Sequence, residues 1–283
     1  MSSNTFNELL ETGAHFGHLK SKWNPAMAPY IYAEKNGIHI IDLNKTVAKL
    51  DEAAAAIKQI ARSGKKILFV ATKKQAKDIV ADKVKAVGMP YVTERWPGGM
   101  LTNFATIRKA VRKMSQIDKM ATDGTFDNIS KKEKLQISRE RAKLETNLGS
   151  VADLTRLPSA LFIVDITKEH IAVAEAKRLN IPTFAIVDTN SNPNFVDYAI
   201  PANDDASSSI AYIVDTMCKA INEGLGDRKM DKEAAAAEEK ESRDSKEGAE
   251  LLAEGVSIKG VKPEKDEEGG ARKGGRKRTT AKK

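Results

Sequence analysis

The feature that most constrains the fold is the short, continuously apolar run Ile67–Val70, which has no side chain suited to water. A run of this kind is typical of a strand that is buried on both faces in a parallel sheet. Further strand signals follow at Tyr91–Val92, Leu161–Val164, Phe184–Val187 and Tyr198–Ile200. Helical segments alternate with them, so the sequence predicts a three-layer α/β domain with a central parallel sheet, flavodoxin- or Rossmann-like.

Helical spacing of apolar residues predicts the layers that cover this sheet. The predicted helices are Phe6–Glu11, 44–63, 72–87, Glu169–Leu179 and Ser207–Glu223. Near the N-terminus, Asn36-Gly37 lies between β-forming segments, which is a strong hairpin signal. Residues 13–25 hold glycines, histidines, lysines and an Asn-Pro pair, a composition typical of an ordered loop.

The connection from Val92 to Leu161 is too long for one strand–helix–strand unit, which needs about 30 residues in all. Two helical segments fill the surplus, separated by a turn at Asp123-Gly124, and Ser130–Glu133 has the pattern of a capping box. Each helix carries one narrow apolar stripe. The pattern predicts an antiparallel coiled-coil hairpin over residues 102–149.

The segment Arg95–Phe104, R-W-P-G-G-M-L-T-N-F, stands where the body would meet this hairpin. Pro97 lacks a backbone donor and the two following glycines are conformationally loose, so the segment suits neither a helix nor a central strand. It predicts a corner. Thr102 and Asn103 are predicted to cap the helix that follows.

The composition changes after residue 226. Residues 227–283 contain no aromatic side chain and few apolar ones, so they cannot bury enough surface to offset the entropy cost of ordering. The predicted organisation is therefore an α/β body over 1–101 and 150–226, the hairpin over 102–149, and a disordered charged tail over 227–283 with a basic end. Transient helix is expected near Met230–Ala253.

Charge is unevenly distributed along the chain. Residues 102–149 hold 11 Lys+Arg against 6 Asp+Glu, whereas residues 150–268 hold 14 against 24 and residues 269–283 hold 7 against none. A chain with separate basic and acidic parts favours a polyanionic partner on one side, most often nucleic acid. A solubilising role for the lysine-rich faces is the alternative.

The sequence argues against several other classes. The single cysteine, Cys218, allows no internal disulfide and is expected in the core, and the absence of a signal peptide or a long apolar run predicts a soluble, cytoplasmic protein without a membrane partner. The loop A-T-K-K after Ile67–Val70 lacks the glycines of nucleotide-binding motifs. An α/β nucleotide- or sugar-phosphate-binding enzyme remains the alternative, because Lys73 and Lys74 open a helix where a phosphate could bind.

Several acidic residues directly follow predicted strands, where parallel strands bring their carboxyl ends together. Oxygen and imidazole ligands there suit a divalent metal, whereas turn and helix-cap roles explain the same residues. We therefore predict no cofactor and keep a divalent cation as the alternative. The candidate ligands are His15, His18, Asp188, Asp204 and Asp205. Asp165 also directly follows a predicted strand.

Nine motifs in order resemble one known family. They are G-A-H-F-G-H with W-N-P (13–25), I-H-I-I-D-L-N-K-T (38–46), I-L-F-V-A-T-K-K (67–74), R-W-P-G-G-M-L-T-N (95–103), D-G-T-F (123–126), L-P-S-A-L-F-I-V-D (157–165), E-H-I-A-V-A-E-A (169–176), I-P-T-F-A-I-V-D-T-N (181–190) and I-P-A-N-D-D-A (200–206). Across residues 5 to 225 the chain resembles the bacterial small-subunit ribosomal proteins of the S-two family.

The resemblance implies a non-catalytic, ribosome-associated protein with an α/β body and a protruding coiled-coil hairpin. The implied partners are small-subunit ribosomal RNA and neighbouring ribosomal proteins, including the S-one messenger-binding protein, which such a protein helps to recruit. No small-molecule substrate is implied. Family bodies end near Gly226, so the resemblance does not cover the tail.

Basic and aromatic residues of the loops and the hairpin are the predicted RNA contacts, made mainly to phosphates. The predicted contacts are Lys20, Lys22, Trp23, Lys73, Lys74, Arg95, Arg108, Lys109, Arg112, Lys113, Lys131, Lys132, Arg139 and Arg141. Arg95 and its neighbour Trp96 are expected to lie against RNA or against the base of the hairpin.

Overall fold

The computed structural model describes residues 2–123 and 130–257. Its contacts divide the chain into two compact units, Met1–Lys232 and Glu233–Lys283. All of the strands in the described residues lie in the first unit.

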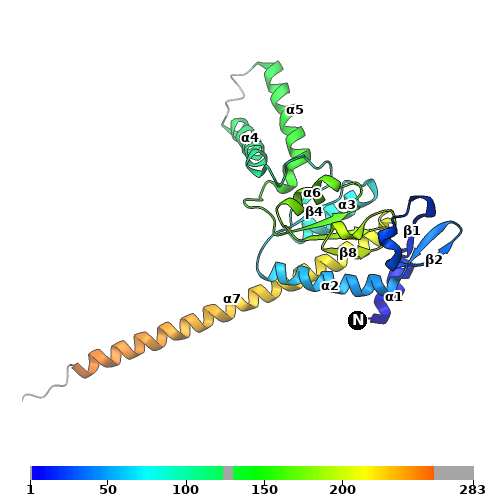
Figure 1. Ribbon diagram of the computed structural model, residues 1–283. Helices are drawn as coiled ribbons and strands as arrows, with labels where there is room; N and C mark the ends of the chain where they lie inside the picture. The colour runs from blue at the N-terminus through cyan, green and yellow to red at the C-terminus, as the bar shows by residue number, and fades with distance from the viewer. Residues whose placement is uncertain (1, 124–129, 258–283) are drawn as a thin grey trace, which may run out of the picture. The chain divides into compact units, whose positions relative to one another are not determined.

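The centre of the first unit is a parallel sheet of five strands (Figure 1). The strands are β4 (Ile67–Val70), β5 (Tyr91–Val92), β6 (Ala160–Val164), β7 (Thr183–Val187) and β8 (Tyr198–Pro201). Their spatial order is β5-β4-β6-β7-β8, so the chain adds one strand on one side of β4 and the rest on the other. This is the doubly wound order 2-1-3-4-5, and it confirms the predicted fold class.

Alternate residues of each strand face two separate cores, as strand geometry requires. Phe69, Phe162 and Phe184 pack on one face under α2 (Leu43–Arg62), α3 (Lys74–Ala86) and the start of α7 (Ser207–Ser257). Leu161 and Ile163 pack on the other face. That face is covered by α6 (His170–Arg178), by the corner and by the base of the hairpin. The continuous apolar runs thus arise because both faces are buried.

An antiparallel sheet of β1 (Phe16–Leu19), β2 (Ile31–Lys35) and β3 (Ile38–Ile41), in the order β1-β3-β2, precedes the parallel one in the chain. The predicted hairpin is confirmed as β2 (Ile31–Lys35) and β3 (Ile38–Ile41), and Asn36 and Gly37 take the positive φ values of 54° and 75° that such a tight turn needs. The helix α1 (Ser2–Glu11) also agrees with expectation.

The prediction of a loop over residues 13–25 was wrong in part. Phe16–Leu19 forms β1, which pairs with β3 through an irregular register, and 3₁₀ turns occupy Lys20–Lys22 and Pro25–Tyr30. The strand lies at an edge and its side chains are exposed or half-buried, so it has no alternating apolar pattern to reveal it. Gly17 is required there, because a Cβ would lie 2.6 Å from the Thr189 side chain.

The inserted helices are α4 (Phe104–Thr122) and α5 (Lys131–Leu148). They pack against each other, and the ion pairs Lys113–Glu140 and Asp118–Arg141 join them. Both hydrogen bonds of the predicted capping box at Ser130 and Glu133 are present. Coiled-coil geometry stays a prediction, and most of the predicted turn at Asp123-Gly124 lies outside the described residues.

The last helix was predicted to end at Glu223, but α7 continues to Ser257. Gly224 is not a stop signal: a Cβ there would lie 2.4 Å from the carbonyl oxygen of Lys58, so glycine permits close packing on α2. Figure 1 shows α2 beside the first part of α7, and the ion pair between Lys58 and Glu223 joins them. Disorder is not confirmed for 227–257, and residues 258–283 lie outside the described part.

Candidate nucleic-acid interface

The corner Arg95–Phe104 is built around one buried carboxylate, that of Glu175 on α6, which is 8% exposed. Its Oε1 accepts hydrogen bonds from the indole nitrogen of Trp96 at 3.1 Å and from the amide of Gly99 at 2.8 Å. Its Oε2 accepts from the amides of Leu101 and Thr102 at 2.9 and 3.0 Å and from the Thr102 hydroxyl at 3.1 Å. One side chain therefore fixes the path of the whole corner.

This arrangement has an electrostatic consequence. Burial alone raises the pKa of Glu175, but the hydrogen bonds from Thr102, Trp96, Leu101 and Gly99 outweigh it and hold that pKa below its ordinary value. The ionised carboxylate is thus the form that the corner binds. Charge-assisted bonds of this kind are about twice as strong as neutral ones.

The predicted capping roles at the corner need correction. Asn103 is the first flanking residue of α4, but its side chain accepts no bond from the helix backbone and instead accepts from the Thr106 hydroxyl at 2.8 Å. Thr102 donates to Glu175 rather than accepting from α4. A carboxylate distant in sequence competes successfully with local capping. Trp96 is buried beside it, so of the two expected positions it takes the hairpin base.

Most of the predicted RNA contacts are exposed. None of the following eight side chains forms an ion pair with another described residue, which leaves their charges available to a phosphate. They are Lys22, Lys74, Arg95, Lys109, Arg112, Lys131, Lys132 and Arg139. Six of the eight lie on the corner or the hairpin, where Lys and Arg outnumber Asp and Glu.

Other predicted contacts already have partners within the chain. Lys20 pairs with Glu34 at 2.7 Å, and Arg108 donates to the carbonyl oxygen of Thr155 at 2.7 Å. Lys113 and Arg141 take part in the ion pairs between α4 and α5. Trp23 is partly exposed and its ring lies 5.3 Å from that of His39. These bonds are at the surface, where ion pairs are weak and can be exchanged for RNA phosphates.

Lys73 differs from the rest because its side chain is only 13% exposed. Its ammonium lies 2.7 Å from carboxylate oxygens of Asp204 and Asp205 and 3.4 Å from Asp165. Burial lowers the pKa of Lys73, but the bonds and charges of Asp204, Asp205 and Asp165 raise it overall. Lys73 therefore neutralises the carboxyl edge of the sheet, and its ammonium is engaged by these carboxylates.

The same edge brings together most of the candidate metal ligands. His18 Nδ1 lies 3.0 Å from Asp188 and its Nε2 lies 3.4 Å from Asp205. Ligand atoms of His18, Asp188 and Asp204 all lie within 4.8 Å of one another. The hydrogen bond that His18 donates to Asp188 raises the pKa of His18. Burial, with the charges of Asp165 and Asp188, raises the pKa of Asp204 to about 7. An imidazole and two carboxylates are a ligand set that suits a divalent cation.

His15, the remaining candidate ligand, lies apart from this group. Burial lowers its pKa, and its Nδ1 is buried without a hydrogen-bond partner among the described residues. The ring instead contacts Phe16, with the ring centres 4.0 Å apart.

The geometry also bears on the enzyme alternative. The switch point of the sheet lies between β4 and β6, where α/β folds usually bind a nucleotide. Here that edge carries the carboxylates of Asp165, Asp204 and Glu169, and Glu169 occupies the amide and hydroxyl of Thr72. Carboxylates repel a nucleotide phosphate, so the edge suits a cation better. Cys218 is buried in the core as expected, and burial raises its pKa to about 11.

Comparison with known proteins decides the family. The profile of the family described as ribosomal protein S2 matches residues 9–224. The chain belongs to the ribosomal protein S2 family. It is 69% identical to the small ribosomal subunit protein uS2 of Parabacteroides distasonis over 247 residues, which are 87% of this chain and 89% of that protein. It is 72% identical to uS2 of Porphyromonas gingivalis over 232 residues, covering 82% and 83% of the two chains.

The S2 family match ends at residue 224, at the point where Gly224 of α7 packs on α2, and residues 225–283 lie beyond it. Among the described helices, none combines the length and the apolar character that a membrane span requires.

Glu175, which organises the corner of this S2-family chain, was not predicted from the sequence, because no local pattern connects it to residues some 75 positions earlier. The only signal was a glutamate at an inward position of an amphipathic helix.

Proposed function

We propose that the chain is a structural component of the small ribosomal subunit in the cytoplasm, where it binds small-subunit ribosomal RNA and neighbouring ribosomal proteins without catalysis. The observation that carries the proposal is the family match over residues 9–224. Relatives at about 70% identity bear the name of a small-subunit protein, which supports the same assembly for this chain.

The corner and the hairpin are the proposed RNA-binding surface. Arg95 is exposed beside the Glu175 cluster, and Lys109, Arg112 and Arg139 are exposed on α4 and α5. Lysine and arginine bind RNA chiefly through phosphates, whose neutralisation releases counterions and makes affinity salt-dependent. The buried Glu175 holds the base of the hairpin and thus the direction from which these cations approach RNA.

The more acidic part of the chain is the proposed protein-facing side. Within it, residues 150–226 of the body hold 5 Lys+Arg against 10 Asp+Glu, a net negative charge that RNA repels and basic ribosomal proteins attract. Recruitment of the S-one messenger-binding protein belongs to this proposal and rests on the family resemblance. The tail 227–283 has no proposed partner.

Sedimentation tests the proposal. We expect the protein to migrate with isolated small subunits at low salt and to be released at high salt. The charge-reversal pair Lys109→Glu and Arg112→Glu should weaken this association at least tenfold, whereas Lys85→Glu, at an exposed position of α3, should not. A soluble pool that stays off ribosomes and binds a mononucleotide would support the enzyme alternative instead.

A further inference from the structure

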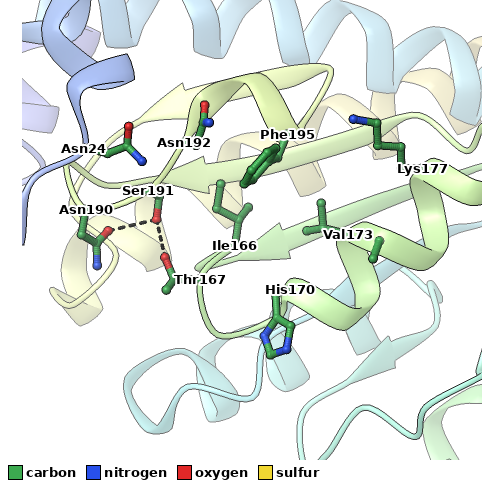
Figure 2. Close-up of a pocket in the computed structure, with 11 residues that line it drawn as sticks. Asn24, Ile166, Thr167, His170, Val173, Lys177, Asn190, Ser191, Asn192 and Phe195 are labelled. Carbon is green, nitrogen blue, oxygen red and sulfur yellow. Dashed lines mark hydrogen bonds between the residues drawn. The ribbon is translucent and has the colours of Figure 1, made fainter.

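A pocket of about 470 Å³ opens at the carboxyl edge of the sheet, outside the carboxylate group around Lys73 (Figure 2). It lies between the connection from β6 to α6 and the segment that follows β7. None of the residues named above as predicted RNA contacts of this S2-family chain lines the pocket. It is open on one side, so a ring attached to a chain could enter.

The apolar part of the pocket is formed by Ile166, Val173 and Phe195. Phe195 is 56% exposed, which is unusual for so large an apolar side chain, and it follows Pro193 in a 3₁₀ turn that fixes its backbone. Figure 2 shows the Phe195 ring near Ile166 at the centre of the group. An exposed ring over an apolar floor offers a stacking surface for another flat ring.

The polar part of the pocket presents donors. Asn24 Oδ1 accepts from the amide of Ala26, and Asn192 Oδ1 accepts from the amide of Asn194, so both carboxamide oxygens are used within the chain. Their NH₂ groups have no hydrogen-bond partner in the described part of the protein. Both therefore remain available as donors to a ligand, which favours a ring with carbonyl or ring-nitrogen acceptors.

The lining of the pocket carries positive charge and no negative charge. Lys177 and His170 are exposed at the rim, and no carboxylate lines the pocket. In Figure 2, Asn24 and Asn190 lie toward one end and Lys177 toward the other. A cation at one end and amide donors at the other suit a ligand that combines a phosphate with an acceptor-bearing ring.

We propose that this pocket takes one unstacked nucleotide of single-stranded RNA, with its base on Phe195, its base edge or sugar on the Asn24 and Asn192 amides, and a phosphate at Lys177. The proposal rests on the proposed function as an RNA-binding ribosomal protein and adds a site outside the corner and hairpin. Aromatic side chains recognise splayed bases in this way, and lysine binds the phosphate as a point charge. An acidic peptide also suits the charge, but the flat exposed ring and the paired donors favour a base.

Binding of short RNA probes to the full-length protein is the first test. A uridylate hexamer should bind at least tenfold more tightly than an abasic ribose-phosphate hexamer of the same charge. Phe195→Ala should remove this difference, and Phe195→Tyr should keep it. Tyr32→Ala removes a ring that is 77% exposed on β2, outside the pocket, and should have no effect. Equal binding of the two probes to the wild type would overturn the proposal.

The variant Asn192→Asp tests the donor role of the Asn192 side chain without disturbing the hydrogen bond that this side chain accepts within the fold. Aspartate keeps the acceptor for the Asn194 amide but replaces the NH₂ donor by a charged oxygen, so uridylate binding should fall about tenfold at unchanged thermal stability. Unchanged binding would contradict the assigned role of this amide.

Crosslinking in the assembled subunit distinguishes failure of the pocket from failure of the proposed function. A photoreactive benzoylphenylalanine at position 195 should crosslink to ribosomal RNA in purified small subunits. Incorporation without any RNA crosslink, or with a protein crosslink alone, overturns the pocket proposal only. Absence of the chain from small subunits overturns the proposed function itself.

Discussion

The indole nitrogen of Trp96 donates to a carboxylate oxygen of Glu175 across 3.1 Å, although the two residues are 79 positions apart in the chain. Through this bond and its neighbours, α6 holds the segment from which the hairpin leaves the body. The packing of α6 on the sheet and the position of α4 are thereby coupled.

Replacement of Glu175 should be among the most destabilising single changes in the body. Glu175→Gln keeps the shape but removes the charge and turns one acceptor into a donor that faces backbone amides. We expect a loss of about 2–4 kcal/mol in the free energy of unfolding, measured by denaturant titration. Glu145→Gln, at an exposed ion pair with Arg141, should cost less than about 1 kcal/mol. Equal losses would contradict the central role of Glu175.

The lowered pKa of Glu175 predicts a pH dependence of definite sign. Because the folded pKa lies below the unfolded one, its stabilisation is complete above the unfolded value of about 4.3 and is lost as the pH falls through the folded pKa. The difference in unfolding free energy between wild type and Glu175→Gln should therefore shrink from about pH 6 toward about pH 3. A difference that does not change with pH would argue against an ionised carboxylate.

The two corner glycines should respond differently to substitution. Gly99 has a φ of 83°, and a Cβ there would lie 3.2 Å from Cβ of Asn103, whereas a Cβ at Gly98 would meet open space. Gly99→Val should cost about 1–3 kcal/mol, and Gly98→Val should cost much less. The double variant should weaken incorporation into small subunits more than loss of any single hairpin lysine. Sedimentation measures this, and normal incorporation would reduce the segment to a simple turn.

Two glycines in α7 form a second matched pair. Gly224→Ala would place a Cβ 2.4 Å from the carbonyl oxygen of Lys58, so α7 must move from α2 at a cost of about 1–3 kcal/mol. Gly226 faces open space within the same helix, and Gly226→Ala should stabilise the protein by up to about 1 kcal/mol. Thermal unfolding of both variants checks the pair. Destabilisation by both would mean that α7 does not tolerate side chains there at all.

The hypothesis of a divalent cation at the carboxyl edge makes a separate prediction. His18→Ala removes one of the clustered ligands, whereas His15→Ala changes a ring outside the cluster. Elemental analysis of the purified protein should then find metal in the wild type and in His15→Ala but not in His18→Ala. If mild chelation releases no divalent ion from the wild type, Lys73 alone neutralises the carboxylates and the hypothesis fails.

Patterns within a few residues predicted the regular elements well. The run Ile67–Val70 became a strand buried on both faces, and Ser130 with Glu133 formed the expected capping box, because in both cases the deciding interactions are local or periodic. Alternation of strands and helices predicted the parallel sheet with helices on both faces, whereas the strand order became known only from the structure.

Features decided by distant partners were not predictable in the same way. β1 exists because β3 offers an edge, and Thr102 leaves its capping role because Glu175 competes for its amide and hydroxyl. Gly224 has the sequence pattern of a helix stop, but glycine is needed there because the backbone of α2 lies beside it. In the candidate site, strand ends predicted that Asp188 and Asp204 would gather, with His15 or His18 as the imidazole. They did not predict that the imidazole would be His18 or that Lys73 would lie among these carboxylates.

The insertion of the hairpin between β5 and β6 affects the order in which the body can fold. Ile67 of β4 pairs with Ala160 of β6, so pairing at the centre of the sheet closes a loop that contains the entire corner and hairpin. A long flexible connection makes such closure slow and entropically costly. Because α4 and α5 pack on each other locally, the hairpin can form early and shorten the loop that remains to be closed. The arm proposed to bind RNA in the mature particle would then also assist the folding of the domain that carries it.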